Sequence, residues 1–144
     1  MLILSVDPGE TSGFFLFNSA DKVHYNEKDR DIIVSLGEKD NYYGFDSLIE
    51  NYSPDLIVYE EFKLYPWKAK QKAWSTFPTV EVIGVLRYLA EKHNIEMIGQ
   101  GADTKDYFDD KKLKWCSMHK GYSPHERDAI RHGFFYLEFG GESD

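Results

Sequence analysis

The chain has 144 residues and a net charge of −8, a length that suits one domain with its own buried core. Its single cysteine, Cys116, excludes a disulfide framework and a multi-cysteine zinc site. No apolar run approaches the roughly 20 residues of a membrane span, and the N-terminal segment lacks the basic start of a signal peptide. We therefore expect a single cytoplasmic domain over residues 1–144, with no membrane partner.

Two apolar segments open the chain on either side of a turn. Residues 2–7 and 13–18 are predicted strands, and the Pro8-Gly9 turn between them lets the second pair back onto the first. Residues 22–27 are predicted as the third strand of this meander. Asp7 ends the first strand, and an unpaired buried carboxylate is costly. Asp7 therefore either begins an exposed turn or lies beside a cation.

The rest of the chain alternates helices and strands. Apolar residues at three-to-four spacing predict a helix over 42–52, and the apolar segment 55–62 predicts a strand that ends on acids. A helix from about Thr79 and a strand over 95–100 then form a parallel crossover. Ser123-Pro124-His125-Glu126 is a capping box that begins the last helix. This order predicts an α/β fold, with three antiparallel strands, then parallel strands, in a mixed sheet flanked by helices.

Acidic groups end two of these strands, and a third acid and a histidine begin the last helix. His125 and Asp128 are three residues apart, so they face the same side of that helix. If the strands that end at Asp7 and at Glu60 or Glu61 are adjacent and parallel, their acids meet at one sheet edge. Carboxylates gathered there need a cation, and oxygen ligands with one histidine favour Mg²⁺ or Mn²⁺ over zinc. Two such ions about 3.5–4 Å apart support phosphodiester hydrolysis.

Two segments without acids, residues 62–80 and 111–123, mix lysines with aromatic residues. This mixture suits a phosphate backbone with partly unstacked bases. The alternative is that both segments are solvated faces whose aromatic residues cover the core. The candidate DNA-binding residues are Lys63, Trp67, Lys68, Lys70 and Lys72 in the first segment and Lys111, Lys112 and Lys114 in the second.

Three segments in order carry a family resemblance. "ILSVDPGETSGFFLF" resembles the first hairpin of the RuvC family of Holliday junction resolvases, "LIVYEEF" its second acidic strand, and "HERDAIRHG" its closing helix. The likeness covers nearly the whole chain. The compact length and the segment "TVEVIGVLRYLA" are most similar to phage-encoded members, which would act in the cytoplasm of a bacterial host.

This resemblance implies a ribonuclease H-like fold and a homodimer that serves DNA recombination or repair. It implies Mg²⁺-dependent nicking of four-way junctions, forks and flaps, with two ions in each active site, Mn²⁺ able to substitute, and no nucleotide cofactor. The implied catalytic and metal-binding residues are Asp7, Glu60, His125 and Asp128, with Glu61 as the alternative acid.

Two other functions remain as alternatives. One is a branched-DNA binding module that has lost cleavage, although a degenerate site has no reason to keep four mutually repelling groups. The other is a fragment of an actin-like ATPase, which also begins with a strand ending in aspartate. Such an ATPase needs a second domain with further phosphate-binding turns, for which 144 residues leave no room.

Overall fold

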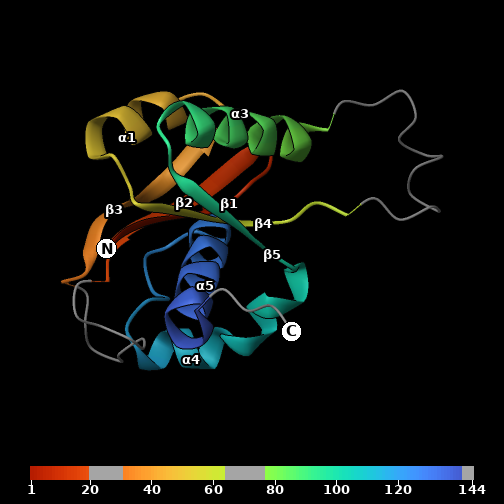
Figure 1. The fold of residues 1–144 in the computed structure, drawn as a ribbon. Helices are drawn as coiled ribbons and strands as arrows, with labels where there is room; N and C mark the ends of the chain where they lie inside the picture. The colour runs from red at the N-terminus through yellow and green to blue at the C-terminus, as the bar shows by residue number, and fades with distance from the viewer. Residues whose placement is uncertain (20–30, 64–76, 141–144) are drawn as a thin grey trace.

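The structure is a computed structural model that describes residues 1–19, 31–63 and 77–140 (Figure 1). Its centre is a five-stranded sheet in the order β3-β2-β1-β4-β5. The first three strands in the chain are antiparallel, whereas β4 and β5 run parallel to β1. The strands are β1 (Leu2–Asp7), β2 (Thr11–Asn18), β3 (Ile33–Asp40), β4 (Leu56–Glu60) and β5 (Glu96–Gln100).

Helices cover both faces of the sheet, as Figure 1 shows. One face carries α1 (Phe45–Tyr52) and α3 (Pro78–Lys92). The other carries the 3₁₀ helix η1 (Ala102–Tyr107), α4 (Asp110–Trp115) and α5 (Pro124–Phe139). None of the described helices is long and apolar enough to cross a membrane.

The sheet separates two hydrophobic cores, because successive strand side chains point to opposite faces. Ile3 and Val58 pack toward α5, whereas Leu4 and Ile57 pack toward α1 and α3. The same alternation turns Ser5 toward α5, where its hydroxyl donates to the Ala129 carbonyl. Asp7 ends β1 two residues after Ser5, and Glu60 ends β4 two residues after Val58. Both side chains therefore also face α5.

Two glycines let α5 lie directly on the hairpin. A Cβ on Gly13 of β2 would lie 1.9 Å from the carbonyl oxygen of His125, and one on Gly133 would lie 2.8 Å from the Phe17 ring. At its N-terminus, α5 has the predicted capping box, in which Ser123 Oγ accepts from the Glu126 N–H and Glu126 accepts from the Ser123 N–H. The first turn of α5 is thus fixed beside the end of β1.

The predicted mixed α/β sheet is confirmed, with two differences in detail. The segment that pairs with β2 was predicted wrongly: β3 is residues 33–40, and residues 22–27 lie outside the described parts of the chain. Both edges of β2 are already paired, with β1 and β3. The helix predicted over 42–52 begins only at Phe45, because Gly44 is left-handed with φ +90°.

Candidate functional site: a carboxylate cluster at the end of β1 and β4

Asp7 and Glu60 lie side by side at the carboxyl ends of two parallel strands. The register pairs Val6 with Tyr59, so Asp7 and Glu60 are the next residues along it. Both side chains point to the face of the sheet that α5 covers. Glu61 has the opposite parity, and its carboxylate lies over β5, where a Cβ on Gly99 would be 2.5 Å from Oε1. The structure therefore places Glu60, rather than Glu61, beside Asp7.

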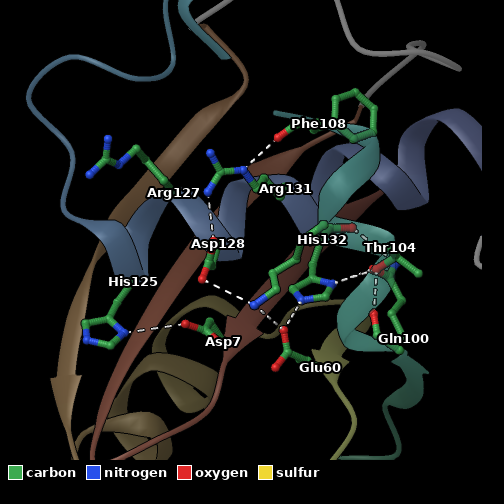
Figure 2. A network of polar contacts seen from close by, with 12 residues as sticks. Asp7, Glu60, Gln100, Thr104, Phe108, His125, Arg127, Asp128, Arg131 and His132 are labelled. Carbon is green, nitrogen blue, oxygen red and sulfur yellow. Dashed lines mark hydrogen bonds and ion pairs between the residues drawn. The ribbon is translucent and has the colours of Figure 1, made fainter. Parts of the chain in front are cut away.

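The first turn of α5 brings His125 and Asp128 to the same place (Figure 2). His125 Nδ1 lies 3.5 Å from Asp7 Oδ2, and the His125 side chain is 49% exposed. Asp7, His125 and Asp128 line an open pocket of about 690 Å³ together with the Pro8-Gly9 turn. All four predicted site residues thus gather at one edge of the sheet.

Lys105 of η1, which the sequence did not single out, reaches into this cluster. Its ammonium lies 2.9 Å from Glu60 Oε1 and 3.4 Å from Asp128 Oδ2. A lone lysine in a short 3₁₀ helix has no periodicity that would have marked it. The lysine supplies a positive charge between two of the carboxylates.

Two further residues of α5 support the cluster and were also missed. His132 Nε2 lies 3.0 Å from Glu60 Oε1. Arg131 donates from Nη1 to Asp128 Oδ1 at 2.8 Å and from Nε to the Phe108 carbonyl at 2.6 Å. The signal that could have found them is helical spacing, since both follow Asp128 by three or four residues and so share its face.

Burial and mutual repulsion shape the charges of this site. Burial of Asp7 and the neighbouring Glu60 and Asp128 carboxylates raise the pKa of Asp7 from 3.8 to about 7, against the opposing effects of Lys105 and His125. Burial also acts to raise the pKa of Glu60, but hydrogen bonds from His132 and Lys105 outweigh it and lower the pKa. The same contacts with Glu60 raise the pKa of Lys105 despite its partial burial. The surroundings of Asp7 therefore disfavour its charged form, whereas those of Glu60 favour it.

The chemistry of this donor set fits a divalent cation. Three carboxylates and an imidazole are ligands for Mg²⁺ or Mn²⁺. Burial, together with the Glu60 and Asp128 carboxylates, raises the pKa of Asp7, and a cation placed beside Asp7 would oppose that rise. Within the described residues, no three His, Cys, Asp or Glu side chains already converge on one metal position. Between Glu60 and Asp128 lies the Lys105 ammonium, 2.9 Å from Glu60 Oε1 and 3.4 Å from Asp128 Oδ2.

The candidate DNA-binding lysines are only partly described. Lys111 and Lys114 are exposed on α4, beside α5, whereas Lys112 donates to the Tyr107 carbonyl and lies 4.8 Å above the Tyr107 ring. Lys63 lines a pocket with Glu60 and Glu61. Trp67, Lys68, Lys70 and Lys72 lie outside the described residues.

The mixed sheet, with its antiparallel hairpin, parallel strands and closing helix, is a ribonuclease H-like fold. More specifically, the chain has the fold of the RuvC-like Holliday junction resolvases. It is similar to Thermus thermophilus RuvC, with a TM-score of 0.70 and 12% identity over 98% of both chains. It is also similar to RuvC of that organism in complex with a Holliday junction substrate, with a TM-score of 0.68 and 12% identity over 94% of both chains.

A viral protein shares the fold at a greater structural distance. Fowlpox virus resolvase, solved in complex with Holliday junction DNA, has a TM-score of 0.56 and 15% identity over 94% of this chain and 97% of that one. The sequence matches no protein-family model, and no curated protein is significantly similar to it. The likeness is therefore visible in the structure and only faintly in the sequence.

Proposed function

We propose that the protein is a divalent-metal-dependent endonuclease that nicks Holliday junctions and other branched DNA. The observation that carries the proposal is the meeting of Asp7, Glu60 and Asp128 with His125 at one sheet edge of a RuvC-like fold. The similar structures include two complexes with Holliday junction DNA, which supports the same class of substrate here.

Asp7, Glu60, His125 and Asp128 would hold the metal, Mg²⁺ or Mn²⁺, with two ions in each site. Such ions supply Lewis-acid activation of water and stabilise the charge on the leaving 3′ oxygen. Asp7 supports this role because it is buried and its pKa is raised, so a bound cation would favour its ionised form. His125 faces Asp7 through Nδ1 and would orient that carboxylate.

Two basic residues of the chain, Lys105 and Arg131, form ion pairs with the carboxylates of the site. Lys105 keeps Glu60 and Asp128 close together, and Arg131 holds the other oxygen of Asp128. These contacts keep the carboxylates gathered despite their repulsion. If a cation took over the charge of these carboxylates, the Lys105 ammonium would be able to contact a phosphate of the DNA backbone.

DNA would lie across this edge of the sheet and the adjoining basic residues. Lys63 lines a pocket with Glu60, and Lys111 and Lys114 are exposed on α4; we propose that these lysines contact the DNA backbone and that Lys68, Lys70, Lys72 and Trp67 extend the contact. Recognition would read the shape of the branch more than base edges, since lysines contact mainly phosphates. A homodimer would present two such sites to the two strands of a junction that must be cut.

The test is incubation of the protein with a labelled four-way junction, a fork and a linear duplex in Mg²⁺, Mn²⁺ or EDTA. We expect nicking of the branched substrates with either metal and none with EDTA. Asp7→Asn is the matched control, since it keeps the shape of the side chain but removes a metal-binding charge. Cleavage by this variant at the wild-type rate would contradict the proposed mechanism, and binding without any cleavage by the wild type would favour the inactive binding module.

A further inference from the structure

His132 is a fully buried histidine of α5 that connects Glu60 to the end of β5 (Figure 2). Its Nε2 lies 3.0 Å from Glu60 Oε1, and its Nδ1 lies 2.7 Å from Gln100 Oε1. Both ring nitrogens of a buried side chain are therefore engaged by polar groups. The imidazole makes no direct contribution to the surface of the pocket.

The hydrogen bonds around the ring determine its orientation. Gln100 Nε2 donates to the backbone carbonyl of His132 at 3.2 Å, so the amide oxygen of Gln100 is the atom that faces Nδ1. Thr104 Oγ1 donates to the Gly101 carbonyl at 2.8 Å and lies 3.3 Å from Nδ1. Both neighbours of Nδ1 act as acceptors, and the partner of Nε2 is a carboxylate oxygen, so each ring nitrogen donates through its own N–H, Nδ1 to Gln100 and Nε2 to Glu60.

This arrangement joins four elements beneath the carboxylate cluster. Glu60 and Gln100 are register partners on β4 and β5, Thr104 is on η1, and His132 is on α5, one turn after Asp128. A shift of the His132 ring would break its contacts with Glu60, Gln100 and Thr104 at once. The ring is thus a rigid support for one carboxylate oxygen.

The two oxygens of Glu60 have different surroundings. Oε1 contacts both His132 Nε2 and Lys105 Nζ, whereas no described residue makes a hydrogen bond or ion pair with Oε2. Lys105 is a flexible side chain that is partly exposed, but His132 cannot leave without disrupting the core. His132 therefore keeps its hold on Oε1 when Lys105 moves away, and Oε2 stays available.

We propose that His132 is a positioning residue that fixes the Glu60 carboxylate, so that its second oxygen is presented to a divalent cation. This inference rests on the proposed function of the carboxylate cluster. Carboxylates that bind metal are commonly held by a further hydrogen bond, and loss of such a support typically costs 10–100-fold in metal affinity.

A pair of substitutions separates positioning from packing. The amide nitrogen of Gln in His132→Gln can occupy the place of Nε2 and donate to Glu60. In His132→Asn the shorter amide reaches only the place of Nδ1, toward Gln100. Both variants bury an amide at the same position. We expect His132→Asn to weaken Mn²⁺ affinity by about tenfold or more, and His132→Gln to restore most of it.

The measurement is Mn²⁺ titration of the purified protein by calorimetry without DNA, with thermal unfolding and the Mn²⁺ dependence of junction nicking recorded beside it. Ser5→Ala is the control, because it removes another buried bond between α5 and the sheet, from Ser5 Oγ to the Ala129 carbonyl. We expect it to lower thermal stability while keeping Mn²⁺ affinity. The concentration of Mn²⁺ for half-maximal nicking should change in the same order as the affinities.

Each outcome has one interpretation. If the wild type binds Mn²⁺ no better than Asp7→Asn, the proposed metal site fails, and the role of His132 fails with it. If the wild type binds and Asp7→Asn does not, but His132→Asn binds like the wild type, only the role of His132 is overturned. Equal losses in His132→Asn and His132→Gln, or an equal loss in Ser5→Ala, would show general loosening of the core and would also overturn it.

Discussion

Burial and the neighbouring carboxylates disfavour the charged form of Asp7 in the folded protein. A carboxyl whose pKa rises on folding is disfavoured in its charged form, so its contribution to stability is lost as pH rises from its unfolded pKa to its folded pKa. For Asp7 that interval runs from 3.8 to about 7. Without metal, the folded protein should therefore be relatively less stable at pH 8 than at pH 5 on account of this residue.

We predict that Asp7→Asn raises the unfolding midpoint of the metal-free protein, and that the difference from wild type is larger at pH 8 than at pH 5. The amide removes the charge that Glu60 and Asp128 repel. Since about 1 kcal/mol moves the midpoint of a domain of this size by about 2–4 °C, the gain should reach a few degrees at pH 8. Thermal unfolding in EDTA at both pH values measures it, and a difference that does not grow with pH would contradict the raised pKa.

A second prediction at this scale concerns the doubled acid that ends β4. Glu60→Gln should abolish junction nicking, because Glu60 faces Asp7 and α5, whereas Glu61→Gln should retain it, because Glu61 faces the opposite side of the sheet. Single-turnover nicking at saturating Mg²⁺ compares the two variants, which differ by one position and carry the same chemical change. The reverse result would move the metal-binding role to Glu61.

The sequence predicted the residues of the site better than it predicted their supports. Asp7, His125 and Asp128 were candidates because they end a strand or begin a helix, whereas Glu60 was preferred to Glu61 from the family resemblance. His132 and Lys105 were not, because a buried histidine inside a helix and a lysine in a 3₁₀ turn acquire their meaning only from residues distant in the chain. Strand parity could have separated Glu60 from Glu61 only once the boundary of β4 was known.

At the scale of elements, the position of α5 on the hairpin places both His125 and Asp128. This position depends on Gly13, whose missing side chain admits the carbonyl of His125. A larger residue would meet backbone, which cannot turn aside as a flexible side chain can. The glycine that follows the Asp7 turn is therefore part of the site's architecture.

We predict that Gly13→Ala destabilises the protein by at least about 1–3 kcal/mol, the usual cost of overpacking, and reduces nicking by displacing the first turn of α5. Gly84→Ala is the matched control: nothing lies within 4 Å of a Cβ at Gly84 in α3, and alanine at this exposed helix position should stabilise the protein by about 0.5–1 kcal/mol. Chemical denaturation and nicking assays measure both variants. A folded Gly13→Ala protein with wild-type nicking would show that α5 does not need this close approach.

The elements that the sequence predicted well were those with strong local signals. The β1–β2 hairpin, α3 and the capping box of α5 follow from apolar patterns, Pro78 and the Ser123 cap. In contrast, β3 carries a glycine and has only half-buried and exposed positions, so its pairing with β2 is decided by the sheet rather than by its own sequence. The short helices η1 and α4 depend on packing against α5 and have no long periodic pattern.

At the scale of the whole molecule, an acidic protein must still hold a polyanion. With a net charge of −8, the general field of the chain repels DNA, so binding has to come from local positive surfaces. On the described part of the chain, exposed Lys111 and Lys114 of α4 lie on the same side of the sheet as the carboxylates. Lys68, Lys70 and Lys72 are the corresponding candidates in the segment that follows Lys63.

The last prediction tests these lysines through the salt dependence of junction binding. Each lost phosphate contact should reduce the slope of log affinity against log salt by about 0.9. The triple change of Lys68, Lys70 and Lys72 to Ala should thus lower the slope by up to about 2.7, and the double change of Lys111 and Lys114 to Ala by up to about 1.8.

Lys92→Ala is the control, because exposed Lys92 ends α3, which runs back from the carboxyl end of β4 to the opposite edge of the sheet. Single-turnover nicking at saturating DNA should change far less than affinity, since these lysines hold the backbone and not the metal. Unchanged slopes in the folded variants would show that both segments are solvated faces and that DNA is held elsewhere.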